Sequence, residues 1–148
     1  RKAIAAADVV FGRRVLFVRD GLGARGVTWR AALWRTFVRP PVPPRVPEPG
    51  AVSVEPEAEV DPDFYLRIGY PIIAGRAVRA DQLERAASHL STLGPGPWPL
   101  PPELGAWLGV RRHRVETIVS ALGYRKGDKG WAPAPKKKRS RGRRPKRS

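Results

Sequence analysis

Two groups of Lys and Arg residues near the C-terminal end are the side chains of this chain best suited to bind a ligand. Residues 132–148 contain nine basic residues and no acid, and residues 111–114 read Arg-Arg-His-Arg. Clustered guanidinium and ammonium groups bind polyanions, above all the phosphate backbone of a nucleic acid, because binding releases condensed counterions. The sequence therefore predicts a phosphate-binding surface; the alternative is a basic end that is only solvated.

The residues expected to contact nucleic acid lie at the start of a predicted helix, in a predicted hairpin and in the basic end. The helix residues are expected to meet base edges and phosphates, and the hairpin residues to hold the flanking backbone. The alternative for the helix arginines is a solvated face. The residues concerned are Arg111, Arg112, His113, Arg114, Arg125, Lys126, Lys129, Lys136, Lys137, Lys138, Arg139, Arg141, Arg143 and Arg144.

Residues 100–131 have the pattern that positions these side chains. We expect a short helix, a turn at Gly109–Val110, a second helix over about residues 111–122, and a tight hairpin over residues 124–131. This order predicts a winged helix-turn-helix, whose second helix enters the major groove of DNA. The positions expected to face the core are Leu104, Trp107, Leu108, Val115, Ile118, Val119 and Leu122.

A strand pair and an Arg-rich helix are expected in residues 1–39. Apolar runs on both sides of Gly12 predict two short strands joined by a turn. From Ala24 onward apolar residues recur at helical spacing, which predicts a helix that ends before Pro40. Its core-facing positions are Val27, Ala31, Trp34 and Val38, widened by Leu33 and Phe37, with Arg25, Arg35 and Arg39 on the opposite side.

Two tryptophans of this helix are candidates for stacking on unpaired bases, because aromatic rings and guanidinium planes bind single strands in this way. Trp34 lies on the apolar side of the helix and is expected in the core. Trp29 is therefore the better candidate.

The remainder of the chain is expected to form a linker, a helical domain and a tail. Residues 40–63 are rich in proline and then in acids, a composition typical of an extended spacer. The acids either stay solvated or cover a basic surface of the same chain. Residues 64–131 are predicted to add a hairpin around Ala74–Gly75 and a helix from about Asp81 to the winged-helix-like unit. The predicted fold class is α+β, with parts 1–39, 40–63, 64–131 and a disordered tail, 132–148.

The composition excludes several classes of site. Cysteine is absent, and the two histidines, His89 and His113, lie on separate predicted helices, so a metal site is not expected. No apolar run approaches the roughly 18 residues that span a bilayer, so we expect no membrane contact and a cytoplasmic location. Methionine is absent even at position 1, which predicts that the chain is a piece of a longer polypeptide.

Residues 21–26, GLGARG, match the G-x-G-x-x-G pattern of dinucleotide-binding turns. Such a site also needs a second parallel strand with an acid about 20 residues further on, where this chain has its proline run. Val27-Thr28 stands where a phosphate-binding loop has Lys followed by Ser or Thr. The acids cluster in the predicted linker, where nothing positions them for acid–base catalysis. No cofactor and no catalytic residue are therefore predicted for this chain.

The order of features from about Asp8 to the basic end resembles the C-terminal region of alphaproteobacterial helicases related to the Suv3-like RNA helicases. In such proteins two RecA-like motor domains carry the motifs for ATP binding and hydrolysis, and this chain contains none of them. The resemblance implies an accessory region, with the motor domains of the parent chain as partners. The chain departs from the pattern of these helicases at residues 21–26, which leaves the role of residues 1–39 open. The segments that carry it are the strand pair, Leu33-Trp34, Pro49–Val54, Phe64-Tyr65, Ile68–Tyr70, Gly75–Arg79, Asp81–Arg85 and Leu122–Tyr124.

The expected function is therefore a nucleic-acid-binding accessory module of an ATP-dependent helicase, with RNA favoured over DNA and no enzymatic activity of its own. One alternative is a protein-interaction module of a nucleic-acid-processing protein, in which the linker or the helical unit recruits a partner. Another is a small stand-alone basic protein that binds nucleic acid. The sequence distinguishes neither RNA from DNA nor single strands from duplex.

Overall fold

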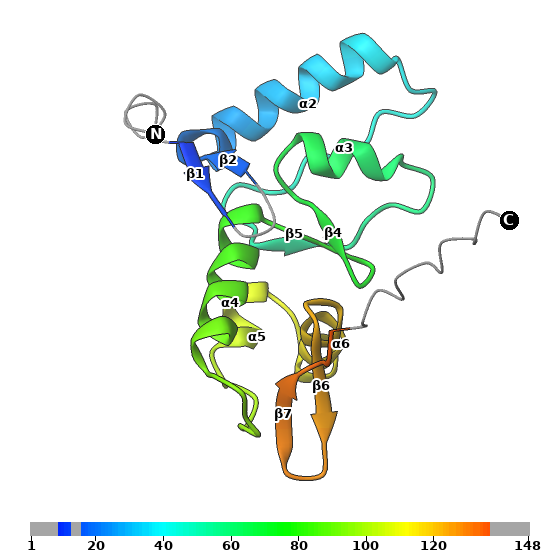
Figure 1. Cartoon of the computed structure of the whole chain (residues 1–148). Coiled ribbons are helices and arrows are strands. Elements are labelled where there is room, and N and C mark those ends of the chain that lie inside the picture. Colours follow the sequence, from blue (N-terminus) through cyan, green and yellow to red (C-terminus); the bar gives the residue numbers. More distant parts are fainter. Residues whose placement is uncertain (1–8, 13–15, 137–148) are drawn as a thin grey trace, which may run out of the picture.

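The structure is a computed structural model that describes residues 9–12 and 16–136 of the chain. Short helices and small antiparallel sheets alternate along it, so the fold is α+β, as predicted (Figure 1). In Figure 1 the long helix α2 (Ala24–Val38) lies at one end of the molecule, and the hairpin of β6 (Tyr124–Gly127) and β7 (Gly130–Pro133) lies at the other.

The first described elements confirm the predicted strand pair. β1 (Val9–Phe11) and β2 (Leu16–Val18) pair in antiparallel fashion. A 3-10 turn, η1 (Arg19–Leu22), leads into α2. The helix ends close to its predicted end, because Arg39 takes a left-handed conformation with φ 50° and the following Pro40 has no N–H to donate.

The prediction that Leu33 and Phe37 widen the core-facing side of α2 is wrong. Their side chains are 50% and 83% exposed, and that of Val38 is 52% exposed. The helix that packs against α2 is α3 (Pro62–Arg67), which has six residues. Such a helix is roughly 9 Å long against about 22 Å for α2, so it covers only a narrow stripe. The buried residues of α2 are Val27, Ala31 and Trp34.

Residues 40–63, predicted as a linker, begin by packing on α2. Pro44 is buried, and its carbonyl oxygen accepts a hydrogen bond from the Arg35 guanidinium. Arg35 is therefore half-buried against residues 40–63, although it was predicted on the side opposite the core-facing residues.

Two buried tyrosines fix the second half of this segment. The Tyr65 hydroxyl accepts a hydrogen bond from the Glu57 N–H at 2.8 Å. The Tyr70 hydroxyl donates one to the carbonyl oxygen of Ala51 at 2.6 Å. Residues 40–63 are thus part of the packed structure and do more than join two parts of it.

A three-stranded antiparallel sheet stands in the middle of the molecule. β5 (Arg76–Val78) is its central strand, between β3 (Ser53–Val54) and β4 (Ile72–Ile73). β4 and β5 form the predicted hairpin. Its turn residues Ala74 and Gly75 both have positive φ, 47° and 75°, as two-residue hairpins of type I′ require.

β5 separates the two larger clusters of buried apolar side chains. Consecutive strand residues point to opposite faces, so Ala77 and Val78, both fully buried, belong to different clusters. The predicted boundary between residues 63 and 64 falls inside α3, whereas the cores divide at β5. The Ala77 cluster also contains Val27, Ala31, Trp34, Phe64, Tyr65, Ile68 and Tyr70. The Val78 cluster contains Leu83, Ala86, Ala87, Leu90, Trp98, Leu104, Leu108, Val115, Ile118, Val119, Leu122 and Trp131.

Three helices and a hairpin build the unit around the Val78 cluster. α4 (Ala80–Thr92), α5 (Leu104–Leu108) and α6 (Arg112–Ala121) lie close to their predicted positions, and β6 and β7 form the predicted hairpin. Gly109, between α5 and α6, has φ 64°, the left-handed conformation that commonly ends a helix.

Trp98 connects the hairpin to the segment between α4 and α5. Its N–H donates to the carbonyl oxygen of Trp131 at 2.9 Å, and the Trp131 N–H donates to the carbonyl oxygen of Trp98 at 2.8 Å. Of the positions predicted for this core, Trp107 differs, because it is only half-buried. The Arg85 guanidinium carbon lies 4.3 Å from the centroid of the Trp107 ring, which is a cation–π contact.

We expect the substitution Tyr70→Phe to lower the free energy of unfolding by about 1 kcal/mol, because it leaves the Ala51 carbonyl oxygen without its donor. Chemical denaturation of the whole chain measures this. Tyr124→Phe is the matched control: its hydroxyl has no hydrogen bond within the described residues, so its effect should stay within about 0.5 kcal/mol. Equal stability of the Tyr70→Phe variant and the wild type would contradict a packed 40–63 segment.

Candidate nucleic-acid interface

The first turn of α6 presents predicted residues in exposed positions. Arg111 immediately precedes the helix, and Arg112 and His113 are exposed within its first turn. The Arg111 side chain makes no capping hydrogen bond, and this turn contains no acid. The free backbone N–H groups and the helix dipole therefore add positive potential to that of the guanidinium groups. Such an end attracts phosphate.

Arg114 differs from its neighbours, because it is held in an ion pair. Its guanidinium donates to Oε1 of Glu55 at 3.2 Å, and the Arg76 guanidinium donates to Oε2 of Glu55 at 2.9 Å. The hydrogen bond from Arg76, followed by that from Arg114, holds the pKa of Glu55 below its usual value of 4.5. At this residue the acidic stretch covers a basic surface of the same chain, one of the two possibilities that the sequence leaves open.

Close packing between β3 and the turn before α6 places Glu55 beside Arg114. Ser53 Oγ donates a hydrogen bond to the carbonyl oxygen of Gly109 at 3.2 Å. A Cβ atom at position 109 would lie 2.4 Å from Cγ2 of Val52, so any other residue there would push the two segments apart. The glycine thus serves both the turn and the contact that brings the acid to α6.

The β6–β7 hairpin carries three further predicted residues, Arg125, Lys126 and Lys129, and all three are exposed. Nζ of Lys126 donates to Oε1 of Glu116 on α6 at 3.1 Å, so this lysine holds the hairpin against the helix. Arg125 and Lys129 form no ion pair with any described residue. These two residues are therefore free to meet a phosphate.

The basic end begins beside α6. The Ala134 N–H donates to the carbonyl oxygen of Gly123, directly behind the helix, at 2.9 Å. Lys136, which is exposed, follows two residues later. The predicted residues Lys137, Lys138, Arg139, Arg141, Arg143 and Arg144 lie outside the described residues.

The pairing of Glu55 with Arg76 and Arg114 is the part of the site that sequence reasoning did not find. Arg76 appeared only as a strand residue, and Glu55 only as one acid of a predicted linker. Glu55 and Arg114 are 59 positions apart, and no local pattern marks residues that meet only through tertiary packing.

Gly26 allows close packing of the backbone in residues 21–26. A Cβ atom on Gly26 would lie 2.6 Å from the carbonyl oxygen of Gly21, whereas one on Gly21 would meet only the movable end of the Arg30 side chain. The chain therefore turns tightly between η1 and α2.

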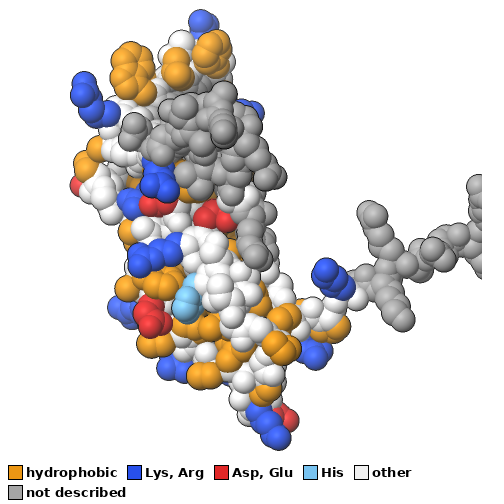
Figure 2. All heavy atoms as spheres, turned by 60° about the vertical axis from the view of Figure 1, so that its left-hand side comes forward, with side chains coloured by type: hydrophobic (Ala, Val, Ile, Leu, Met, Phe, Trp, Pro, Cys, Tyr) orange, Lys and Arg blue, Asp and Glu red, His pale blue; other side chains and the backbone are white. Residues whose placement is uncertain are grey.

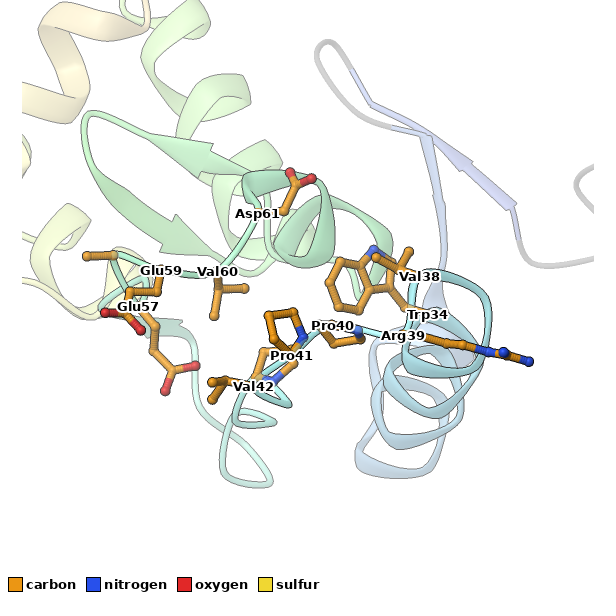
Figure 3. A pocket seen from close by; sticks show the side chains of 12 residues that line it. Trp34, Val38, Arg39, Pro40, Pro41, Val42, Glu57, Glu59, Val60 and Asp61 are labelled. Atoms are coloured by element: carbon orange, nitrogen blue, oxygen red, sulfur yellow. The ribbon is translucent and has the colours of Figure 1, made fainter.

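An apolar hollow of about 520 Å³ lies beside the end of α2 (Figure 3). The Asp61 carboxylate points away from it and accepts a hydrogen bond from the Asp63 N–H at 2.9 Å. The Glu57 carboxylate accepts one from the Arg45 N–H at 3.1 Å. Both acids thus take part in local structure, and the described part of the chain contains no group of three or more His, Asp or Glu that could hold a metal ion. Apolar side chains around the hollow are Trp34, Val38, Pro40, Pro41, Val42, Pro44 and Val60.

We expect the pKa of the Glu55 carboxyl to lie below 4.5. The substitution Arg76→Ala should raise this pKa more than Arg114→Ala does, because the hydrogen bond from Arg76 is the larger cause of the lowered value. A lowered pKa means that the ionised carboxylate stabilises the fold above pH 4.5 and that this contribution disappears as the pH falls through the lower value. NMR titration of the side-chain carboxyl carbon measures the midpoint. An ordinary midpoint in the wild type would contradict the ion-pair arrangement.

The chain matches no protein-family model, no curated protein and no solved structure. Within its described residues, none of the helices has the length and apolar character needed to cross a membrane. What the protein does is therefore inferred from its own charges and geometry: an uncapped basic helix start, two free cations on the adjacent hairpin, and a basic end that begins beside the same helix.

Proposed function

We propose that this chain is a nucleic-acid-binding accessory module in which α4, α5, α6 and the β6–β7 hairpin act as a winged helix-turn-helix. The order of the elements supports this proposal. α4 is followed by the bridge residue Trp98, then by α5, the turn at Gly109, α6 and the hairpin. The bridge joins Trp98 to Trp131 of β7, so the hairpin is attached to the helical unit and can serve as its wing.

α6 has the two sides that a recognition helix needs. Val115, Ile118 and Val119 are buried in the core, which leaves the opposite side free. In helix-turn-helix proteins the second helix enters the groove, and its N-terminal residues reach bases and phosphates. The observation that carries the proposal is the exposed, uncapped, Arg-bearing start of this helix in a chain with a net charge of +16. The exposed side chains of α6 include Arg112, His113, Thr117 and Ser120.

Phosphate contacts are proposed to dominate the binding, with little preference for base sequence. Each phosphate neutralised by a cation releases counterions, so affinity falls steeply as salt is added. In the parent protein, the motor domains of an ATP-dependent helicase would hydrolyse ATP while this module holds the nucleic acid, with RNA as the favoured ligand. The helicase part of the proposal is supported by the sequence resemblance alone.

The substitution Arg112→Ala is expected to weaken binding of a short RNA duplex several-fold and to reduce the slope of log affinity against log salt by about 1, because one phosphate contact is lost. Fluorescence anisotropy at several salt concentrations measures both quantities. Arg45→Ala removes the same charge from an exposed position in residues 40–63, which belongs to neither proposed surface, and should change neither by as much. Equal effects of the two variants would show that α6 is not the contact surface.

The substitution Glu55→Gln is expected to strengthen binding of the same duplex several-fold and to steepen the salt dependence, because it releases Arg114 to contact phosphate. The matched control is Glu59→Gln, which removes one exposed acid from the same segment without freeing an arginine of α6. A gain in affinity no larger than that of the control would contradict a role for Arg114 at the interface.

A further inference from the structure

We propose that the outer side of α2 binds single-stranded nucleic acid by stacking, as a second contact surface besides α6; this inference rests on the proposed function. The surface consists of Trp29, Leu33 and Phe37, which we call the α2 stripe. The three residues follow one another at intervals of four, so their side chains lie in a row along the helix. Figure 2 shows hydrophobic side chains gathered over this end of the molecule, with Lys and Arg side chains beside them.

The α2 stripe is exposed well beyond what the fold requires. Trp29 is 69% exposed, and Phe37 is the most exposed large apolar side chain of the described residues. The core-facing residues of α2 lie on another side of the helix, so the stripe contributes to neither core. Exposed apolar surface of this kind marks a binding site, because water is released when a ligand covers it.

A hollow of about 390 Å³ adjoins the stripe between α2 and α3. Leu33 and Phe37 line it on one side, and Arg30 and Arg67 also contribute. Among the described residues that line it, one carries a carboxylate, Asp63, which pairs with Arg67 at 3.3 Å. An apolar surface bordered by guanidinium groups suits a ligand that is both aromatic and anionic.

The positive charge around the α2 stripe indicates which kind of ligand binds there. α2 contains no acid, and the exposed Arg25 lies one turn before Trp29. A second copy of the chain would bring another net charge of +16 to the same place and be repelled. A nucleic-acid strand supplies a negative phosphate with every base, and the bases stack on aromatic rings while arginines meet the backbone. In a duplex the base faces are already stacked, so a single strand is the matching ligand.

The spacing of the stripe supports more than one contact. Residues four apart on a helix are separated by about 6 Å along its axis, so the Cα atoms of Trp29 and Phe37 lie about 12 Å apart along α2. This separation lets the two rings engage two different bases of an extended strand, with Leu33 between them.

The test is fluorescence anisotropy of the whole chain with a labelled oligouridine. We expect Trp29→Ala and Phe37→Ala each to weaken binding about tenfold or more, because each removes a stacking ring. Leu66→Ala on α3, a half-exposed apolar residue outside the stripe, is the matched control and should leave binding unchanged. Leu33→Ala removes an aliphatic side chain and no ring, so it should weaken binding less than threefold, and Phe37→Tyr should retain affinity because it keeps the ring. All these side chains are at least half exposed, so unchanged melting temperatures should confirm that the variants fold.

Three results would overturn the inference. Wild-type affinity of both ring variants would exclude stacking. Losses of equal size at Leu33 and at the two rings would indicate an apolar protein partner or a non-specific surface effect. Equal losses with an RNA duplex would remove the preference for single strands. Duplex binding that still depends on Arg112 would leave the proposed function intact in each case, whereas a wild-type chain that binds no oligonucleotide would overturn both proposals.

Discussion

The central strand β5 is the element on which the rest of the structure depends. Ala77 is buried in the core beneath α2, Val78 in the core of the helical unit, and Arg76 holds Glu55. Three consecutive residues therefore join both cores and the main charge cluster. Because a strand directs neighbouring side chains to opposite faces, one short strand is enough to contact both cores. Glu55 is brought to α6 through it, although this acid lies 59 positions from Arg114 in sequence.

This arrangement divides the cations into free and engaged groups. Arg76, Arg114 and Lys126 form ion pairs that hold segments together, while Arg111 and Arg112 at the start of α6 have no such partner among the described residues. A net charge of +16 alone would predict a uniformly attractive surface. Among the described residues, free cations lie at the start of α6, on the hairpin and at α2, where Arg25 and Arg39 are exposed, whereas Arg114 is paired with Glu55. A phosphate strand that reaches Arg114 has to compete with Glu55.

Features with local causes were predictable from the sequence, and features with distant causes were not. Helical spacing of apolar residues and glycines at turns identified α2, α4, α6 and the hairpins, because these signals lie within a few residues. The exposure of Leu33 and Phe37 depends on the shortness of α3, and the packing of residues 40–63 depends on Tyr65 and Tyr70. The proline-rich composition of residues 40–63 indicates that this segment is locally stiff, but it does not indicate which surfaces the segment packs against. The candidate site shows the same division, since the helix arginines were identified and the pairing that holds Arg114 was not.

The most direct measurement is an NMR titration of the whole chain with a short RNA duplex, following each backbone amide. If α6 presents its free N–H groups and arginines to phosphate, the amides of Arg112 and His113 should shift first and most strongly, followed by those of the β6–β7 hairpin. These shifts should disappear when salt is added, because the contact is electrostatic. Amide shifts that leave the start of α6 unchanged while RNA is bound would contradict the account.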